Sequence, residues 1–359
     1  MLPIFWKNLP SITDKMIEDA RQTGYSFLAD MLAKLKKGEV VDINSIDTDG
    51  WKHTVLHQAV LAGNIAILKA LIERGAQLNK KNNSGYTPLH DAVIKGDTEI
   101  SKLLIEKLDP AQLNKKNNSG DTPLHVAVTE GNAEISKLLI EKLDPSQLNE
   151  KDSVGNTPLH YAFIKGDTEI SKLLIEKLDP AQLNEKDNSG NTPFYDAVTE
   201  GNVEISKLLI EKLDPAQLNE KNSVGNTPLH DAVSQGNVEI SKLLIEKLDK
   251  SELNEKGYSG YTPLHYAVFQ GNVEISKLLI EKLDKSQLHG KNSVGDTPLY
   301  DAVSQGNVEI SKLLIEKLDK SQLNEKGNRG NTPLHDAIIK AHREIIDTFS
   351  AKVADKHNG

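Results

Sequence analysis

A string of eleven residues recurs along this chain, and it limits the possible folds more than any other feature. The string EISKLLIEKLD starts at Glu99 and returns every 35 residues up to Glu309, seven times in all. A second motif, TPLH or a close variant, returns at the same period from Thr87 to Thr332, with one earlier copy at Thr54. Self-similarity at a fixed period of about 20–50 residues is the signature of repeat architectures. The two motifs together define nine repeats.

Each repeat has the pattern of two short helices separated by a tight turn, as the third repeat shows. Thr122 is a good N-cap, and Pro123 occupies the first helical position, where its missing N–H costs nothing. His125, three residues after the cap, can return a hydrogen bond to it. Gly131 ends the first helix and Asn132 caps the second. Apolar residues at helical spacing give the two helices their buried stripes: Leu124, Ala127 and Val128, then Ile135, Leu138, Leu139 and Leu143.

The repeats are expected to stack. After the second helix comes a polar segment that ends at Gly155 and suits a hairpin-like loop. No single repeat has an apolar face large enough to fold alone. Stacked repeats share one continuous core, so their stability is a sum of unit and neighbour terms.

The chain resembles the ankyrin repeat family. The resemblance is carried by GYTPLHDAVIKGDTEI at residues 85–100 and by the copies of this segment, and it covers about residues 42–350. The tetratricopeptide pattern is missing, and the periods of HEAT and armadillo repeats are longer. The resemblance implies an all-α solenoid of helix–turn–helix units with capping helices at both ends.

One systematic departure from the family pattern predicts an additional element. An ankyrin unit has about 33 residues and usually carries Gly-Ala-Asp-Val-Asn after its second helix. The first repeat keeps this form at residues 75–79, but the next seven replace the glycine with Leu-Asp-Pro or Leu-Asp-Lys. At Leu108 we expect the helix to continue. Asp109 and Pro110 then make a new N-cap and first helical position, which predicts a short third helix or 3₁₀ turn.

Both ends of the array have the pattern of caps. Residues 12–21 and 25–36 predict two helices of a degenerate first unit, and residues 40–44 resemble the strand that follows a repeat. The last helix is more polar than its counterparts, as solubility of a terminal repeat requires. We therefore divide the chain into an N-terminal helical cap (1–49), repeats one to eight (50–331), and the ninth repeat with the C-terminal cap (332–359).

Composition limits the class of partner. The net charge of −9 disfavours nucleic acid or an anionic membrane as the main partner. The absence of cysteine removes disulfides, thiolate metal sites and a cysteine nucleophile, and fits a reducing compartment or an export route without disulfides. No apolar run approaches the roughly 18 residues that span a bilayer. Residues 1–7 are apolar but brief and have no basic lead, so we do not expect a secretory signal.

A histidine ladder runs through the repeats, and we expect it to be structural. Neighbouring histidines would lie about 8–10 Å apart, which is too far to share one metal ion at ligand distances near ~2 Å. Tyr195 and Tyr300 replace the histidine in two repeats, which a proton relay would not tolerate. No phosphate-loop, zinc-protease or nucleophile-elbow motif is present. We therefore expect no catalytic, metal-binding or cofactor-binding residues. The ladder consists of His57, His90, His125, His160, His230, His265 and His335.

The repeats differ mainly at a few positions of the first helix and in the loop before it. In ankyrin proteins these positions line the concave binding surface. The variation at these positions has two possible explanations, specialisation for binding and neutral drift after duplication. Tyr258, Tyr261, Tyr266 and Phe269 place four of the aromatic residues within twelve positions, all predicted to be exposed. Tyr300 follows in the next repeat. Exposed aromatic residues are the usual anchors of interfaces.

Two weaker features lie at the same positions. Tyr161 and Ile164 form a second cluster with Ile94 of an earlier repeat. Aspartates after the motif histidine predict an acidic stripe in the same groove. We expect a partner with basic and apolar side chains to dock across the middle-to-late repeats. The stripe consists of Asp91, Asp196, Asp231, Asp301 and Asp336.

The leading interpretation is a non-catalytic, monomeric scaffold that binds a partner protein on its concave face and loop tips. Its preformed surface loses little ordering entropy on binding. The near-identical repeats and the Lys/Asn/Ile/Glu bias resemble ankyrin proteins that bacterial pathogens and endosymbionts deliver into host cells. We therefore expect a cytoplasmic location, or the host cytoplasm for a secreted effector. A targeting or inhibitory module for a separate enzyme and a purely structural spacer remain the alternatives.

Overall fold

The structure, a computed structural model, describes residues 9–48 and 50–354. Residues 1–7, where we expected no secretory signal, lie outside these ranges. Two compact units divide the chain, residues 1–178 and 179–359. All regular elements in the described ranges are helices, joined by turns and loops. These ranges contain no β-strand, only an isolated bridge between Ile46 and Thr54. The predicted all-α class is confirmed, whereas the division at residues 49 and 331 stays a prediction from the pattern.

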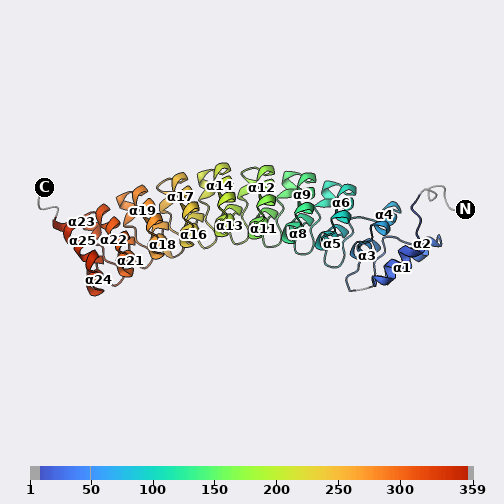
Figure 1. The fold of residues 1–359 in the computed structure, drawn as a ribbon, viewed down its shortest axis with the longest axis horizontal. Helices are drawn as coiled ribbons and strands as arrows, with labels where there is room; N and C mark the ends of the chain where they lie inside the picture. The colour runs from blue at the N-terminus through green and yellow to red at the C-terminus, as the bar shows by residue number, and fades with distance from the viewer. Residues whose placement is uncertain (1–8, 49, 355–359) are drawn as a thin grey trace. The chain divides into compact units, whose positions relative to one another are not determined.

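The first unit contains the N-terminal cap and the first four helix pairs (Figure 1). Cap helices α1 (Asp14–Gln22) and α2 (Ser26–Lys36) pack against each other and lie within two residues of their predicted bounds. The first helices of the repeats pack side by side in one row, and the second helices form another. The first row is α3 (Val55–Ala62), α5 (Pro88–Ile94), α8 (Pro123–Thr129) and α11 (Pro158–Ile164); the second is α4 (Ile65–Glu73), α6 (Thr98–Lys107), α9 (Ala133–Lys142) and α12 (Thr168–Lys177).

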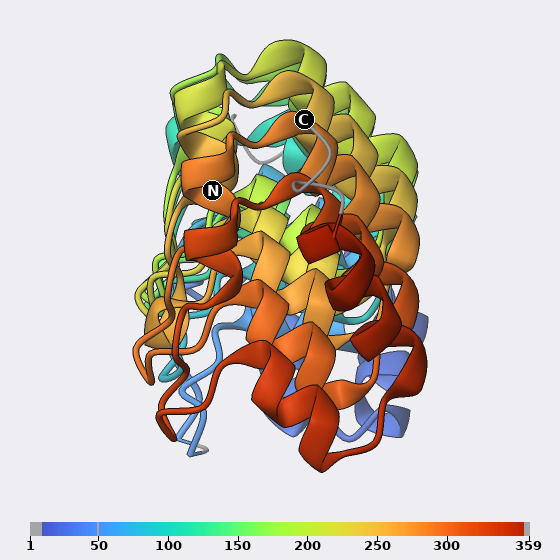
Figure 2. The ribbon, with the colours of Figure 1, turned by 90° about the vertical axis from the view of Figure 1, so that its left-hand side faces the viewer.

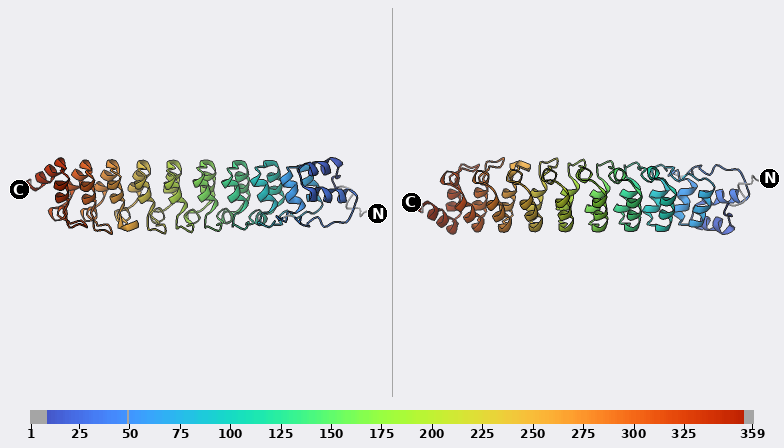
Figure 3. Two further views of the ribbon diagram at one scale, coloured as in Figure 1. Left: turned by 90° about the horizontal axis from the view of Figure 1, so that it is seen from below. Right: turned by 90° about the horizontal axis from the view of Figure 1, so that it is seen from above.

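The second unit contains five such helix pairs. In Figure 2 the helices within each of its two rows lie one behind the other. Figure 3 shows one short helical turn, η4 (Tyr258–Gly260), among the loops along one edge of this unit. The first helices are α13 (Pro193–Thr199), α16 (Pro228–Ser234), α18 (Pro263–Phe269), α21 (Pro298–Gln305) and α24 (Pro333–Ile339). The second helices are α14 (Val203–Lys212), α17 (Val238–Lys247), α19 (Val273–Lys282), α22 (Val308–Lys317) and α25 (Arg343–Ala354).

The predicted third element is present in all seven repeats that carry Leu-Asp-Pro or Leu-Asp-Lys. Our expectation for Leu108 was wrong in one detail, because α6 ends at Lys107 and Leu108 is its extended C-cap, with φ −89° and a buried side chain. Asp109 Oδ1 accepts from the N–H of Gln112 at 2.9 Å, and the N–H of Asp109 donates to Gln112 Oε1 at 3.2 Å. The elements are α7 (Pro110–Leu113), α10 (Pro145–Leu148), η2 (Gln182–Asn184), α15 (Pro215–Leu218), η3 (Glu252–Asn254), α20 (Lys285–Leu288) and α23 (Lys320–Leu323).

The predicted hairpin-like loops between repeats are tight turns without a strand ladder. The N–H of Asn117 donates to the carbonyl of Asp121 at 2.8 Å, and Asn117 Oδ1 accepts from the N–H groups of Ser119 and Asp121, both at 2.9 Å. Because the asparagine side chain takes these donors, no strand ladder is extended. The predicted strand at residues 40–44 is also absent.

The core uses the same positions in every repeat. In the third repeat Leu124, Ala127 and Leu139 have no exposed surface. Burying a leucine of this kind contributes about 1.5–3 kcal/mol. Phe194 replaces the motif leucine in the fifth repeat and is equally buried. Among the described residues, no helix is both long and apolar enough to cross a bilayer.

Candidate interaction surfaces

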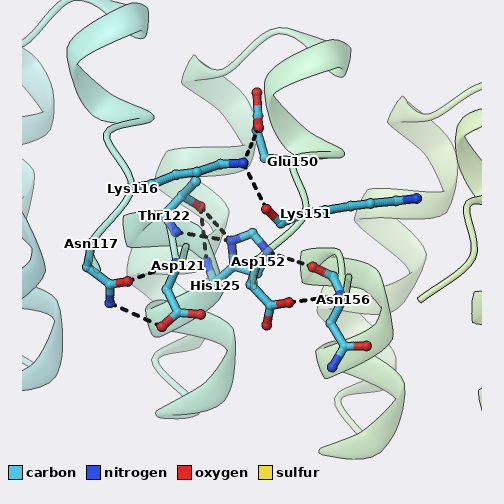
Figure 4. Close-up of polar contacts among 9 residues, drawn as sticks. All are labelled: Lys116, Asn117, Asp121, Thr122, His125, Glu150, Lys151, Asp152 and Asn156. Carbon is cyan, nitrogen blue, oxygen red and sulfur yellow. Dashed lines mark hydrogen bonds and ion pairs between the residues drawn. The ribbon is translucent and has the colours of Figure 1, made fainter. Parts of the chain in front are cut away.

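The histidine of the TPLH motif joins its repeat to the next at His57, His90, His125, His230 and His265, and Figure 4 shows this bond for the third repeat. The N–H and the hydroxyl of Thr122 donate to His125 Nδ1 at 3.2 and 2.8 Å, and Thr122 Oγ1 accepts from the His125 N–H at 3.4 Å. Because Nδ1 accepts, the ring proton is on Nε2, which donates to the carbonyl of Asn156 at 3.1 Å. The predicted capping role is confirmed, and the same ring also bridges two repeats.

Burial keeps these histidines uncharged. Burial lowers the pKa of His90, His230 and His265 to about 4, and it lowers the pKa of His125 as well. A neutral ring with both nitrogens engaged has one tautomer and one orientation. The ladder is therefore a fixed framework for the side chains beside it.

A second set of bonds joins the loops. Lys116 Nζ donates to the carbonyl of Lys151 at 2.8 Å and pairs with Glu150 at 2.7 Å (Figure 4). In the second unit Lys186 makes the same two contacts with Lys221 and Glu220. Half-exposed ion pairs contribute only about 0–1 kcal/mol, so the main effect of these lysines is to fix the spacing between successive loops.

In the second unit the four predicted aromatic residues meet at one depression. Tyr258 lies in η4, Tyr261 precedes α18, and Tyr266 and Phe269 lie on α18. With Ser259 they line a hollow of about 210 Å³. Tyr258 and Phe269 are 62% and 61% exposed, whereas Tyr261 and Tyr266 are half-buried, so the prediction that all four are exposed is confirmed for two of them only. The ring centroids of Tyr261 and Tyr266 lie 5.6 Å apart. We call these four side chains the aromatic patch; rings with this exposure are suited to anchoring a partner.

The loop that carries Tyr258 differs from most of the equivalent loops. In the loops from Asn82 to Asn222 and at Asn292 an Asn or Asp starts the turn, but here Gly257 does, as Gly327 does in the ninth repeat. Asn226 Oδ1 of the preceding repeat accepts from the N–H of Tyr258 at 2.8 Å. A Cβ on Gly257 would lie 2.5 Å from that oxygen, so only glycine fits. Ser259 has a left-handed backbone with φ 53°, which costs about 1 kcal/mol or more. A strained turn therefore presents Tyr258.

The neighbouring repeats carry smaller side chains at the corresponding positions. Helix α18 packs directly between α16 and α21. The aromatic rings of this one repeat are therefore flanked by small hydroxyl side chains, which leave the ring faces open. The positions of Tyr258 and Phe269 are occupied by Ser223 and Ser234 in the preceding repeat, and by Ser293 and Ser304 in the following one.

In the first unit, Ile94 and Tyr161 of the weaker cluster line a depression of about 330 Å³. Ile164 is 48% exposed but does not line it. The hydroxyl of Tyr161 donates to Asp152 at 2.6 Å, and burial together with this bond raises the pKa of Tyr161 to about 12. Sequence reasoning missed Tyr86, which stands before its motif threonine as Tyr261 does. The remaining lining residues are Asp121, Val126, Thr129 and Glu130.

Tyr300 does not belong to the aromatic patch. It replaces the motif histidine on α21 and is therefore buried, with 7% of its surface exposed. Its N–H donates to Thr297 Oγ1 at 3.2 Å. Our expectation that Tyr300 adds to an exposed aromatic surface was wrong, because the repeat position and not the residue type decides its burial.

The predicted acidic stripe carries less charge than the sequence suggests. Asp91, Asp196 and Asp336 are buried, and Asp231 and Asp301 are half-buried. Burial raises the pKa of Asp91, Asp196 and Asp301 to about 7. Burial also raises the pKa of Asp231, although its bond from Tyr195 opposes this. Asp91, Asp196 and Asp301 are consequently only partly ionised at neutral pH.

The described residues were also searched for groups of side chains that could bind a metal ion. Within residues 9–48 and 50–354, no three His, Asp or Glu side chains gather where they could hold a metal ion. Two of the depressions among the described residues, one aromatic and one mixed, lie on a framework fixed by histidine bridges.

Comparison with known proteins identifies the class. The family described as "Ankyrin repeats (3 copies)" matches residues 20–117, 56–152, 94–187, 143–222, 213–289 and 284–358. These segments overlap, and the chain belongs to the ankyrin repeat family. Ankyrin repeats are generally protein–protein interaction modules and are typically non-catalytic.

Two further comparisons are more limited. A search of curated proteins gave no match. Among solved structures, the chain is similar to the ankyrin repeat domain of Bcl-3, described as a unique member of the IkappaB protein family. The TM-score is 0.52 at 27% sequence identity, over 63% of this chain and 98% of the Bcl-3 chain.

Proposed function

We propose that this chain is a non-catalytic scaffold that binds a partner protein through the aromatic patch of its seventh repeat. The observation that carries the proposal is the convergence of Tyr258, Tyr261, Tyr266 and Phe269 on one hollow. The whole sequence has only 2 Trp, 8 Tyr and 6 Phe, so four aromatic side chains in one repeat are not background.

The framework supports this role. His230 and His265 donate to the carbonyls of Tyr261 and Asp296 in the repeats that follow them. These bonds fix the backbone on both sides of the patch before any partner arrives. A preformed surface loses less conformational entropy on binding than one that must be ordered.

The test uses a random peptide library displayed on phage and selected on the full chain. The comparison variant is Tyr258→Ser with Phe269→Ser, which gives both positions the residue that the neighbouring repeats carry. We expect selected peptides to bind the variant at least tenfold more weakly. Val154→Ser, which removes a 52% exposed side chain outside both depressions, is the matched control. Equal binding to the variant and the native chain would show that the aromatic patch is not the site.

A further inference from the structure

The hollow of the aromatic patch has the lining that weakly hydrated cations prefer. Three phenol rings and one phenyl ring supply its walls, with Ser259 as the remaining lining residue. The electron-rich face of an aromatic ring attracts a cation within about 6 Å of its centroid. Tyr261 and Tyr266 are close enough, at 5.6 Å between centroids and 47° between planes, for one flat group to contact both.

Carboxyl groups stand on both sides of these rings. Asp231, Tyr266 and Asp301 occupy the same position in three successive repeats, and their helices α16, α18 and α21 pack side by side. Burial raises the pKa of Tyr261 and Tyr266, and the carboxyls add to these shifts: Asp301 and Asp296 at Tyr261, and Asp231 at Tyr266. No lysine or arginine contributes to either shift. The charged groups that act on these two tyrosines are therefore carboxyls, and a cation bound on the rings would favour the ionised form of Asp301.

We propose that the aromatic patch takes an arginine side chain of the partner, with its guanidinium group lying on the rings between the carboxyls of the flanking repeats. This inference rests on the proposed function and specifies the chemistry of the partner. A guanidinium group is planar, stacks on aromatic faces, and is more weakly hydrated than an ammonium. Its five N–H donors can also be directed towards the half-buried carboxyls of Asp231 and Asp301, which lie on the flanking helices and not in the lining of the hollow.

Two other cations fit the same surroundings less well. A lysine ammonium is a compact, strongly hydrated charge and loses more solvation when it lies on apolar ring faces. A trimethylated ammonium suits aromatic walls, but it has no N–H group to donate to Asp231 or Asp301. The combination of rings with flanking acceptors therefore favours arginine.

The test measures binding of fluorescein-labelled Gly-Leu-Xaa-Leu-Gly peptides to the full chain by fluorescence anisotropy. Xaa is arginine, citrulline, lysine or trimethyllysine; citrulline keeps the shape of arginine and removes its charge. We expect the arginine peptide to bind at least tenfold more tightly than the citrulline peptide and several-fold more tightly than the other two. The double variant Tyr258→Ser with Phe269→Ser should lose this preference, Asp301→Asn should weaken it about threefold, and Val154→Ser should leave it unchanged.

Each of the other results overturns the arginine assignment in a distinguishable way. Equal binding of arginine and citrulline peptides that both depend on the rings leaves the proposed function standing and refutes the role of charge. Equal binding of arginine and lysine peptides reduces the effect to unspecific attraction. Tightest binding of trimethyllysine assigns the hollow to a quaternary ammonium instead. No binding of any of the four peptides also refutes the inference, and the proposed function then depends on the library-selected peptides alone.

Discussion

The phenol of Tyr195 donates a hydrogen bond to the carboxylate of Asp231 in the next repeat. Asn222 Nδ2 donates to the same phenol oxygen at 2.9 Å. At the equivalent position His265 donates to a backbone carbonyl, that of Asp296. Replacing histidine with tyrosine thus keeps a bond between repeats but moves its acceptor from the backbone to a side chain that titrates.

Removing this phenol should destabilise the second unit. We expect Tyr195→Phe to lower the free energy of unfolding by about 1–2 kcal/mol, since a buried hydrogen bond is lost. The pKa of Asp231 should rise further, because the bond from Tyr195 holds it down. Urea unfolding and NMR titration of Asp231 measure the two effects. Tyr300→Phe is the control, for no carboxylate bond of this kind is found at Tyr300 in the part of the chain that the structure describes.

Substitutions in the aromatic patch should leave stability unchanged. Tyr258→Ser and Phe269→Ser remove mostly exposed rings, and surface changes of this kind usually stay within about 0.5 kcal/mol. Phe194→Ala, at a fully buried ring, should cost about 3–5 kcal/mol. Thermal and urea unfolding of the three variants measure the contrast. A large loss at Tyr258 or Phe269 would mean that these rings serve the fold, and binding data on those variants would need reinterpretation.

The hydrogen bond from a motif histidine to the next repeat should add to stability, and a comparison of an internal histidine with the one in the last repeat can measure this. His265 is buried and bonded to Asp296, whereas His335 in the last repeat is exposed and, among the described residues, bonds within its own cap, to Thr332 at 2.7 Å. We expect His265→Ala to cost about 2–4 kcal/mol and His335→Ala about 1 kcal/mol, the value of a lost cap. Similar costs in urea unfolding would argue against a role of the bridge between repeats.

The pH dependence of stability should contain two opposing contributions. The pKa of His265 is about 4 in the folded chain, against 6.5 for an unburied histidine, so its contribution is full above pH 6.5 and is lost as pH falls towards 4. The pKa of Asp301 is about 7 when folded against 3.8, so its contribution is full below pH 3.8 and is lost as pH rises towards 7. The two slopes oppose each other between about pH 4 and 6.5.

Asp301→Asn separates these contributions. The amide does not ionise. The difference in unfolding free energy between the variant and the native chain should therefore shift in favour of the variant by about 1 kcal/mol or more as the pH is raised from 5 to 8. Its loss of stability on acidification should be steeper than that of the native chain, because the histidine contribution is no longer offset. Urea unfolding at both pH values tests this, and an Asn effect that is the same at pH 5 and pH 8 would contradict the raised pKa.

Glycine at position 257 should be needed for steric reasons alone. Its φ is −94°, so alanine would not strain the backbone, but the added Cβ would lie 2.5 Å from Asn226 Oδ1 and 2.8 Å from the His230 ring. We expect Gly257→Ala to destabilise the second unit and to weaken peptide binding by displacing Tyr258. Gly290→Ala is the control, since its nearest neighbour would be 3.5 Å away. Equal unfolding midpoints for the two variants would refute the steric argument.

Much of the fold follows from the sequence because the repeat supplies its own internal comparison. Helix starts at Thr122 and its copies, the short helix after Asp109, and the capping role of the histidines all depend on residues close in sequence. Leu108 could not be assigned correctly in this way, because its extended backbone depends on burying the side chain against the core.

The site was less accessible from sequence, since it depends on contacts between repeats. The exposure of Tyr258 and Phe269 was predicted and is confirmed. The burial of Tyr300 could have been predicted, because Tyr300 occupies the position of the buried motif histidine. We expected it to be exposed because it is an aromatic residue close to the patch. The charge of Asp301 depends on its burial. The close contact between Gly257 and the Asn226 side chain joins residues that are 31 positions apart in the sequence. Neither can be derived from a local pattern.

The acceptor of the histidine bridge has a consequence for how such a chain can grow. His125 donates to the backbone carbonyl of Asn156, and His230 to that of Tyr261. Every amino acid has such a carbonyl, so the junction places no demand on the side chain that comes next. A whole unit can therefore be copied, deleted or reordered in the gene and still meet a competent neighbour. The fifth repeat is different: its Tyr195 requires an aspartate in its successor, and that pair must be inherited together.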